Sequence, residues 1–315
     1  MEKRQLGQSD LQIAPVVFGG NVFGWTIDEK KSHELLDAFT NAGFNAIDTA
    51  DSYSRWAPGN SGGESEEIIG NWMKAKKNRE SIVLMTKVGS DMGEGKNVRK
   101  DYILKAAEAS LKRLKTDYID LYQTHFDDEA TPVEETLSAY DQLVKDGKVR
   151  WIGASNISRE RLTESLDTSE VKGLPIYQTL QPHYNLYARE QYESQYEPLC
   201  LSHGLGVITY FSLESGFLTG KYRSKADLKK SKRGADMDKY FDARGLKILD
   251  ALDEVSNNHN TDPAAIALAW LIKRQSVTAP IVSATSLDQL KSIIEAPQIE
   301  LVADEIGQLN SASFW

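Results

Sequence analysis

The chain has 315 residues, of which 40% are hydrophobic and 26% are charged, proportions that are typical of a soluble globular protein. The formal net charge of −9 argues against non-specific binding to nucleic acid or to an anionic membrane surface. Cys200 is the only cysteine, which excludes an internal disulfide and favours a reducing, cytoplasmic location. We find no signal peptide, no apolar stretch long enough to cross a bilayer and no linker, and therefore predict a single domain over residues 1–315.

Taken in chain order, the first element is a predicted hairpin, followed by eight short apolar runs. Residues 3–13, KRQLGQSDLQI, indicate the hairpin, which we expect to close the bottom of the fold. The apolar runs are mostly continuous rather than alternating, as is typical of parallel strands that are buried on both faces. They cover residues 14–20, 45–50, 81–87, 118–125, 149–156, 176–181, 206–212 and 279–284.

Amphipathic helical patterns lie between the runs. Apolar residues from Leu104 to Leu114 recur at helical spacing. The segment TPVE (131–134) predicts a capping box with proline at the first helical position, and Asp262-Pro263 opens another helix. Strands that alternate with helices predict an α/β fold, a (β/α)₈ TIM barrel. An open doubly wound sheet is the alternative, but no G-x-G-x-x-G follows the first run.

Polar residues collect at the predicted ends of the strands. In a barrel the C-terminal strand ends form one mouth, where active sites lie. These residues are therefore expected to converge, which scattered structural roles would not predict. From the first strand to the eighth they are Gly20 and Asn21, Asp48 with Tyr53, Lys87, His125, Ser155 and Asn156, Gln178, Tyr210 and Ser212, and Ser283 with Thr285.

Four of these residues have side chains that can work together in proton transfer. A tyrosine titrates near ~10 in water, and a neighbouring lysine ammonium favours its phenolate. A carboxylate can keep the lysine charged, and a histidine can hydrogen-bond a substrate oxygen. Asp48, Tyr53, Lys87 and His125 could thus protonate a carbonyl oxygen. Each residue alone has a structural alternative, such as a lysine at the rim or a hydrogen-bonded core histidine.

Seven segments, spread over nearly the whole chain, follow one another in a specific order. They are AGFNAIDTADSY (42–53), GGESEEIIG (62–70), MTKVG (85–89), KTDYIDLYQTH (115–125), DGKVRWIGASN (146–156), YQTLQPHYNL (177–186) and SGFLTGKY (215–222). Together they resemble the aldo-keto reductase superfamily. The pattern is most similar to the bacterial branch that also resembles the β subunits of voltage-gated potassium channels. The resemblance implies a barrel that binds NADP(H) without a Rossmann fold.

The resemblance also implies roles for the four mouth residues. Tyr53 is the acid–base residue, Lys87 lowers its pKa, Asp48 pairs with Lys87, and His125 orients the carbonyl group. Trp25, Trp56 and Phe126 lie just beyond strand ends and are candidates for the substrate pocket, although rim packing would explain them equally well.

Further residues match the family's cofactor site. Ser155, Asn156 and Gln178 match those that hold the nicotinamide carboxamide, and Tyr210 matches the aromatic residue that stacks on the ring. The loop 221–233 carries seven basic residues and one acid, and in the family this loop covers the pyrophosphate, which implicates Lys221 and Arg233. The full set of expected cofactor residues adds Gly20, Asn21, Asp48, Phe211, Ser212, Leu213, Gly216, Ser283, Thr285 and Gln289.

Two departures from the family pattern concern the cofactor. Ser212 stands where a proline is common, and Ile293 stands where an asparagine usually contacts adenine. Ser283, Thr285 and Gln289 can donate hydrogen bonds to a 2′-phosphate but bring no positive charge. We therefore expect NADP(H) as the cofactor, with NAD(H) also usable and a preference for NADPH of only about tenfold.

The leading hypothesis is an NADPH-dependent reductase of small aldehydes or ketones. The alternative is a regulatory subunit that holds NADP(H), senses redox state through a partner and turns over little. Several rounds of turnover would favour the enzyme. We expect a small-molecule carbonyl substrate, no nucleic-acid or membrane partner, and a monomer or weak homo-oligomer. The five histidines show no metal-ligand spacing, so no metal site is predicted.

Overall fold

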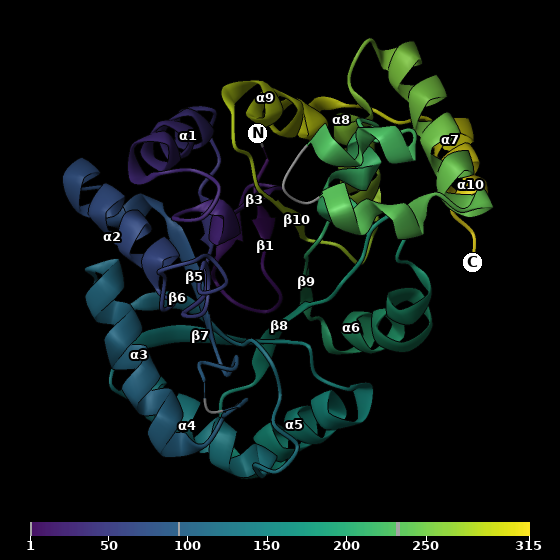
Figure 1. The fold of residues 1–315 in the computed structure, drawn as a ribbon. Coiled ribbons are helices and arrows are strands. Elements are labelled where there is room, and N and C mark those ends of the chain that lie inside the picture. Colours follow the sequence, from purple (N-terminus) through teal and green to yellow (C-terminus); the bar gives the residue numbers. More distant parts are fainter. Residues whose placement is uncertain (1, 94, 231–233) are drawn as a thin grey trace.

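A computed structural model describes residues 2–93, 95–230 and 234–315, except for the side chains of 225, 230 and 234–236. Its centre is a closed barrel of eight parallel strands in the order β10-β3-β4-β5-β6-β7-β8-β9 (Figure 1). The predicted barrel is confirmed, and each predicted run contains one barrel strand, except that β5 ends one residue beyond its run. The strands are β3 Val17–Gly19, β4 Ala46–Asp48, β5 Val83–Val88, β6 Ile119–Thr124, β7 Val149–Ser155, β8 Tyr177–Gln181, β9 Gly206–Thr209 and β10 Ala279–Val282.

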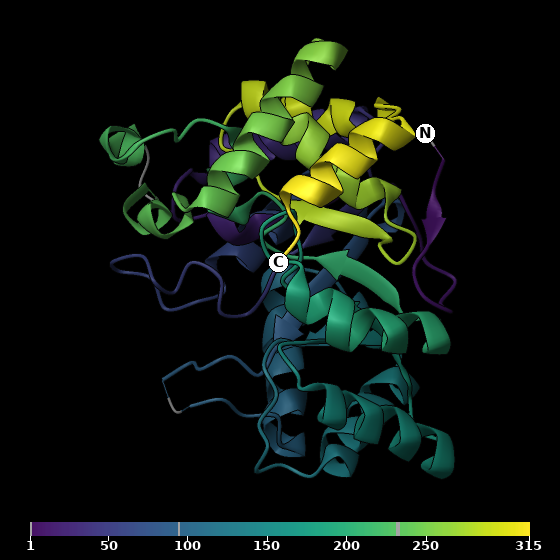
Figure 2. The same cartoon turned by 90° about the vertical axis from the view of Figure 1, so that its right-hand side faces the viewer.

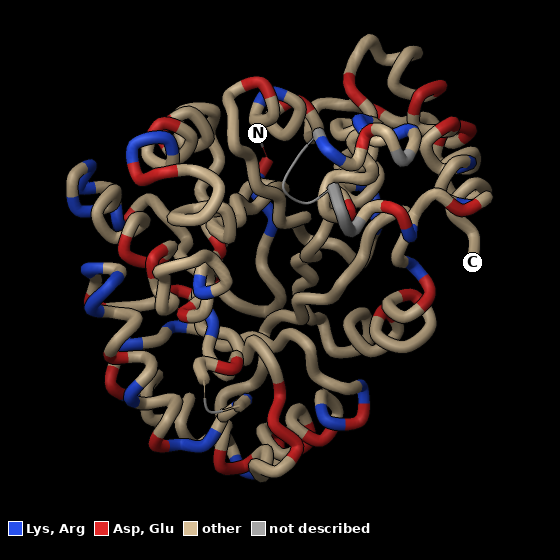
Figure 3. Tube along the Cα trace, in the orientation of Figure 1, with Lys and Arg blue, Asp and Glu red and all other residues tan. Residues whose placement is uncertain are grey.

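Helices surround the barrel and cover the outer face of its strands (Figure 1). Charged residues lie mainly on these helices and their loops (Figure 3). No described helix is long and apolar enough to cross a membrane. The α-helices are α1 Glu29–Asn41, α2 Glu64–Lys76, α3 Lys100–Leu114, α4 Val133–Lys145, α5 Arg159–Lys172, α6 Glu197–His203, α7 Ala243–His259, α8 Pro263–Lys273, α9 Leu287–Glu295 and α10 Ala303–Ala312.

The helix signals were right except for one cap. Helix α8 begins at Pro263 after Asp262, and the apolar face of α3 packs inward, as predicted. The capping box at 131–134 is wrong, because α4 begins at Val133 and has no side-chain capping hydrogen bond. The Thr131 hydroxyl instead donates to the Asp128 carboxylate at 2.8 Å, so it is not available to the helix.

The predicted hairpin closes the bottom of the barrel. Its strands β1 (Arg4–Gln5) and β2 (Gln12–Ile13) pair antiparallel, and it lies at the opposite end from the loops that follow the barrel strands (Figure 2). Gly7 has φ 61°, and a Cβ there would lie 2.1 Å from the carbonyl oxygen of Gln178. The hairpin can therefore approach β8 this closely only with glycine at this position. Apolar side chains from both parts form an inner core: Leu6, Leu11, Ile13, Val17, Ala46, Val83, Met85, Leu121, Ile208, Ala279 and Ile281.

The position of the hairpin overturns one predicted site residue. Gln178 is the second residue of β8, and its side-chain oxygen accepts a hydrogen bond from the backbone N–H of Gln8 at 3.1 Å. Its side chain therefore lies at the bottom of the barrel, and its predicted place at the mouth is wrong. The strand continues for three more residues, and its last one, Gln181, is the residue that reaches the mouth.

Candidate active site

Asp48, Tyr53 and Lys87 meet at the mouth of the barrel. Lys87 lies on β5, and its ammonium donates to Asp48 Oδ2 at 2.6 Å, to Tyr53 Oη at 2.8 Å and to the Thr49 carbonyl at 2.8 Å. Lys87 and Asp48 are both fully buried, at 0% exposure. All three protons of the ammonium are therefore used, and the lysine links the carboxylate to the phenol.

Burial controls the protonation of this group. Burial lowers the pKa of Lys87, while the Asp48 carboxylate acts in the opposite direction and keeps the lysine charged. Burial, and next the Asp48 carboxylate, raise the pKa of Tyr53 well above its usual value. The ammonium that donates to the phenol oxygen opposes this increase. Tyr53 therefore carries its proton at neutral pH, beside a cation that would stabilise the phenolate.

His125 follows β6 directly and faces the same tyrosine. Its ring centroid lies 5.9 Å from that of Tyr53, at an interplanar angle of 76°. Its Nδ1 lies 3.4 Å from the Ser52 hydroxyl oxygen, and its Nε2 makes no hydrogen bond to any described residue. Burial, and next the Lys87 charge, lower the pKa of His125, so its imidazole is neutral at pH 7. A neutral imidazole here can hydrogen-bond a ligand without adding charge.

Two buried glutamines, which the sequence analysis did not identify, hold the other oxygen of Asp48. Gln123 on β6 donates to Asp48 Oδ1 at 3.1 Å, and Gln181 on β8 donates to the same oxygen at 3.2 Å. The Gln181 amide nitrogen also donates to the side-chain oxygen of Gln123 at 3.2 Å. Gln123 was detectable in principle, because it precedes His125 by two residues and the side chains of a strand alternate between faces.

Ser155, Asn156 and Tyr210 form the adjoining wall of the mouth. Asn156 has φ 45°, and its amide nitrogen donates to the His125 carbonyl at 2.8 Å and to the Ser155 hydroxyl at 3.0 Å. The Tyr210 hydroxyl donates to the Asn156 side-chain oxygen at 3.1 Å. Three of the four residues expected to bind the carboxamide and the ring thus lie together, and Gln181 rather than Gln178 lies beside them.

The loop after β9 contains the next group of predicted cofactor residues. Phe211 has φ 51° and is 47% exposed, while the Ser212 hydroxyl is buried and donates to the Ile281 carbonyl at 2.8 Å. Leu213 immediately precedes η4 (Glu214–Thr219), in which Gly216 has φ 101°. A Cβ at Gly216 would lie 3.2 Å from Lys221 Nζ, so the backbone at this glycine lies beside the ammonium of an exposed lysine with no side chain between them. Arg233 lies outside the described residues.

The end of β10 is occupied by hydrogen bonds within the protein. The Ser283 hydroxyl donates to the Gly19 carbonyl at 2.7 Å and also contacts the Asn21 side-chain oxygen, beside Gly20. The Thr285 hydroxyl donates to the Gln289 side-chain oxygen at 3.1 Å. The Ser286 hydroxyl accepts from the Gln289 backbone N–H and caps α9, and Asp288 places a negative charge in the first turn of that helix.

The three aromatic residues expected at the substrate pocket surround Tyr53 and His125. Trp56 is 50% exposed; its ring lies 6.1 Å from that of Tyr53 and 5.6 Å from that of Trp25. Phe126 packs on His125 with 4.8 Å between ring centroids. These rings form an apolar rim on one side of the phenol. Among the described residues, no group of three or more His, Cys, Asp or Glu side chains could hold a metal ion.

A family model for the aldo/keto reductases matches residues 15–313. The chain belongs to this family. An uncharacterized oxidoreductase, YrpG of Bacillus subtilis, is 34% identical over 98% of this chain and 95% of its own length. A probable voltage-gated potassium channel subunit beta of Arabidopsis thaliana is 30% identical over 98% of this chain and 96% of its own length. The aldo-keto reductase AFTS1 of Alternaria alternata is 31% identical over 98% of this chain and 91% of its own length. Membership of the family supports oxidoreductase activity on small carbonyl compounds with a nicotinamide cofactor.

Proposed function

We propose that this aldo-keto reductase reduces aldehydes or ketones to alcohols with NADPH, using Tyr53 as general acid. The observation that carries the proposal is the buried Lys87 ammonium, which donates to both the Asp48 carboxylate and the Tyr53 phenol. This contact places a cation beside the oxygen that would lose its proton. It also fixes the phenol next to His125 and the apolar rim.

Each residue has a separate task in this proposal. Tyr53 donates its proton to the carbonyl oxygen, and Lys87 stabilises the phenolate that remains. Asp48 keeps Lys87 charged and in place, and the two glutamines on its second oxygen hold the carboxylate still. The neutral His125 orients the carbonyl through a hydrogen bond. In the reverse direction the phenolate would accept the proton of an alcohol.

The residues along the mouth fit a nicotinamide dinucleotide, which would supply the hydride when bound. Asn156, Ser155 and Tyr210 present amide and hydroxyl groups, which suit a carboxamide with both donors and an acceptor. Gly216 leaves backbone free of a side chain beside Lys221, which suits a phosphate. We therefore assign the carboxamide end to the first group and the pyrophosphate to the second.

We further propose that NADPH is preferred over NADH only modestly. The hydroxyls of Ser283 and Thr285 are already engaged with protein oxygens, and Asp288 opposes an anion at the start of α9. Arginine is the best partner for a 2′-phosphate, and none occurs between residues 279 and 295.

The family resemblance also supports a second function, that of a redox-sensing subunit with little turnover. The observation in its favour is the similarity to a probable potassium channel β subunit over 98% of this chain. The paired Lys87 and the exposed rim beside Tyr53 favour the enzyme. We expect a cytoplasmic protein, on the basis of its single buried cysteine, and a monomer or weak homo-oligomer.

The test is turnover with added cofactor. Purified protein would be mixed with excess NADPH and 4-nitrobenzaldehyde, and NADPH absorbance would be followed over time. We expect many molecules of NADPH to be oxidised per molecule of protein. At most one equivalent consumed, across a panel of aldehydes, ketones and sugars, would overturn the enzyme and favour the sensor. Repeating the panel with NADH would report the cofactor range.

A further inference from the structure

A cavity of about 550 Å³ is lined by His183, whose ring stacks on Tyr210 at the barrel mouth. It is formed by the segment after β8, by η6 (Gly234–Tyr240) with the start of α7, and by the C-terminal segment. Three aromatic side chains line it, Tyr187, Tyr240 and Trp315, together with His183, Lys239 and Arg244. None of these residues has a part in the proposed reduction, so the cavity is a feature that this function leaves unexplained.

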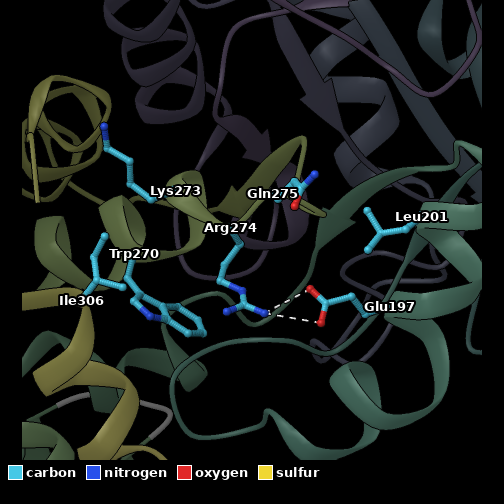
Figure 4. A pocket seen from close by; sticks show the side chains of 7 residues that line it. All are labelled: Glu197, Leu201, Trp270, Lys273, Arg274, Gln275 and Ile306. Atoms are coloured by element: carbon cyan, nitrogen blue, oxygen red, sulfur yellow. Dashed lines mark hydrogen bonds and ion pairs between the residues drawn. The ribbon is translucent and has the colours of Figure 1, made fainter. Parts of the chain in front are cut away.

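The cations in this cavity differ from those in a second cavity in whether they are paired with carboxylates. The second cavity, of about 330 Å³, lies against α6, α8 and α10, and its Arg274 points at Glu197 with 3.0 and 3.4 Å to the two carboxylate oxygens (Figure 4). In the first cavity, no described carboxylate lies within 4 Å of Arg244 or Lys239. Arg244 lies instead 4.3 Å from the Tyr187 ring centroid, and Lys239 lies 4.9 Å from that of Tyr240.

The remaining charges of the first cavity are mostly matched. Arg189 donates to the Glu193 carboxylate at 2.8 and 3.0 Å. Glu214 is 2% exposed; its carboxylate accepts from His183 at 2.8 Å and from Asn185 and Tyr240. Glu190, an exposed residue, also lines the cavity and carries the opposite charge. Arg244 itself donates to the Ser313 carbonyl at 3.4 Å, and the Tyr187 hydroxyl beside it donates to the Asp242 carboxylate at 2.7 Å. Arg244 and Lys239 still lie on aromatic rings without an ion pair to a described residue, and a carboxylate attached to a flat apolar group suits them.

The cavity is linked to the cofactor side of the mouth by direct contacts. The His183 ring stacks on Tyr210, with 5.3 Å between centroids and an interplanar angle of 18°. Tyr210 in turn donates to Asn156. Glu214, which holds His183, begins the η4 segment that contains Gly216. A ligand that displaces His183 would thus move both Tyr210 and the loop that precedes Lys221.

We propose that this cavity binds a small aromatic carboxylate, and that its occupancy changes the affinity of the protein for NADPH. Arg244 and Lys239 hold the carboxylate, while Tyr187, Tyr240 and Trp315 enclose the ring. The proposed binding of the carboxylate depends only on the cavity, whereas its effect on NADPH affinity rests on the proposed function. Reciprocity requires that NADPH change the affinity for the carboxylate by the same factor.

The experiment uses benzoate as the probe and calorimetric titration of the cofactor-free protein. We expect benzoate to bind wild-type protein and Tyr53→Phe with equal affinity. Benzamide, its neutral analogue, should bind at least about tenfold more weakly. Arg244→Gln is expected to weaken benzoate binding by about tenfold or more. Lys247→Gln is the matched control, because Lys247 is an exposed cation on the same helix outside the cavity. It should leave binding unchanged.

The second measurement is the dissociation constant of NADPH with and without saturating benzoate. We expect a change of about fivefold or more in wild type and none in Arg244→Gln. No benzoate binding at millimolar concentration, binding that survives Arg244→Gln, or binding that Tyr53→Phe abolishes would overturn the site. An unchanged NADPH constant would overturn the coupling. Failure of NADPH to bind at all would count against the proposed function, while the benzoate titrations would still decide the site.

Discussion

The floor of the mouth is the group of Asp48, Lys87 and their hydrogen-bond partners at the ends of the barrel strands. It is built differently from the loops that follow β9 and β10. In the floor, Asp48 and Lys87 are fully buried, and four hydrogen bonds from Lys87, Gln123, Gln181 and Tyr53 reach the Asp48 carboxylate. In the loops, Phe211 and Lys221 are exposed, and positive φ angles occur at Phe211, Ser215 and Gly216.

The difference separates two kinds of task. Proton transfer needs groups held at fixed distances, and buried, mutually hydrogen-bonded side chains provide them. A large cofactor must enter and leave, so its phosphates are better met by exposed loops with accessible backbone. We therefore expect substitutions in the floor to have large and specific effects, and those in the loops to have smaller, graded ones.

The substitution Tyr53→Phe is expected to have the largest effect, which is on the catalytic rate. Removing the hydroxyl removes the proposed general acid, and kcat with 4-nitrobenzaldehyde should fall by about 10²–10⁴-fold with little change in NADPH affinity. Tyr122→Phe is the matched control, because the Tyr122 hydroxyl is buried without a hydrogen-bond partner among the described residues. Activity of Tyr53→Phe close to wild type would refute the assignment of this residue.

The next effect concerns stability. Lys87→Met leaves the buried Asp48 carboxylate without its cation, and the free energy of unfolding should fall by about 3–5 kcal/mol. The double variant Asp48→Asn/Lys87→Met removes both charges and should recover part of that loss. Urea unfolding of the two variants measures both quantities. A loss below about 1 kcal/mol in Lys87→Met would mean that the floor is much less tightly coupled than its geometry indicates.

A smaller effect is expected in the loops, where we propose that cofactor choice is decided. We predict that NADPH binds more tightly than NADH by about tenfold, or about 1.4 kcal/mol. Asp288→Asn removes the negative charge from the first turn of α9 and should raise this ratio by up to about fivefold. Asp304→Asn, in the first turn of α10, is the control. Measured dissociation constants would contradict us if NADH were preferred or if the NADPH preference exceeded about a thousandfold.

The last prediction tests whether every buried carboxylate near the floor of the mouth has a partner that compensates for its burial. Asp51 is 4% exposed, its Oδ1 has no hydrogen-bond partner among the described residues, and burial, with Glu66 adding to it, raises its pKa to about 8. The unfolded chain would titrate near ~3.9, so the folded state binds the extra proton between these values. Stability from this group is therefore present below about pH 4 and is lost as pH rises through about 8.

Asp51→Asn should remove that dependence. Relative to the variant, wild type should lose about 1 kcal/mol or more of unfolding free energy between pH 5 and about pH 8.5. Urea unfolding at both values checks this, with Asp117→Asn as the control because Asp117 is exposed. Parallel pH profiles for wild type and Asp51→Asn would show that Asp51 is ionised in the folded protein.

The sequence by itself determined the barrel and brought Asp48, Tyr53, Lys87 and His125 together at its mouth. A strand with a continuous apolar run must be covered on both of its faces. When such strands alternate with helices, only a few fold architectures can cover them. Asp48 ends β4, Lys87 is the last residue but one of β5, and His125 follows β6 directly. Neighbouring strand ends in a barrel are adjacent in space. Their proximity therefore followed from chain order, without knowledge of any distance.

Only the tertiary structure decided which polar groups are free to act. Gln178 and Gln181 lie on the same strand, yet one binds the bottom hairpin and the other binds Asp48. The Ser212 and Ser283 hydroxyls appear available in the sequence but are engaged by carbonyl oxygens of Ile281 and Gly19. A local pattern predicts burial, whereas the partner of a polar atom depends on where each strand ends and on residues distant in the chain.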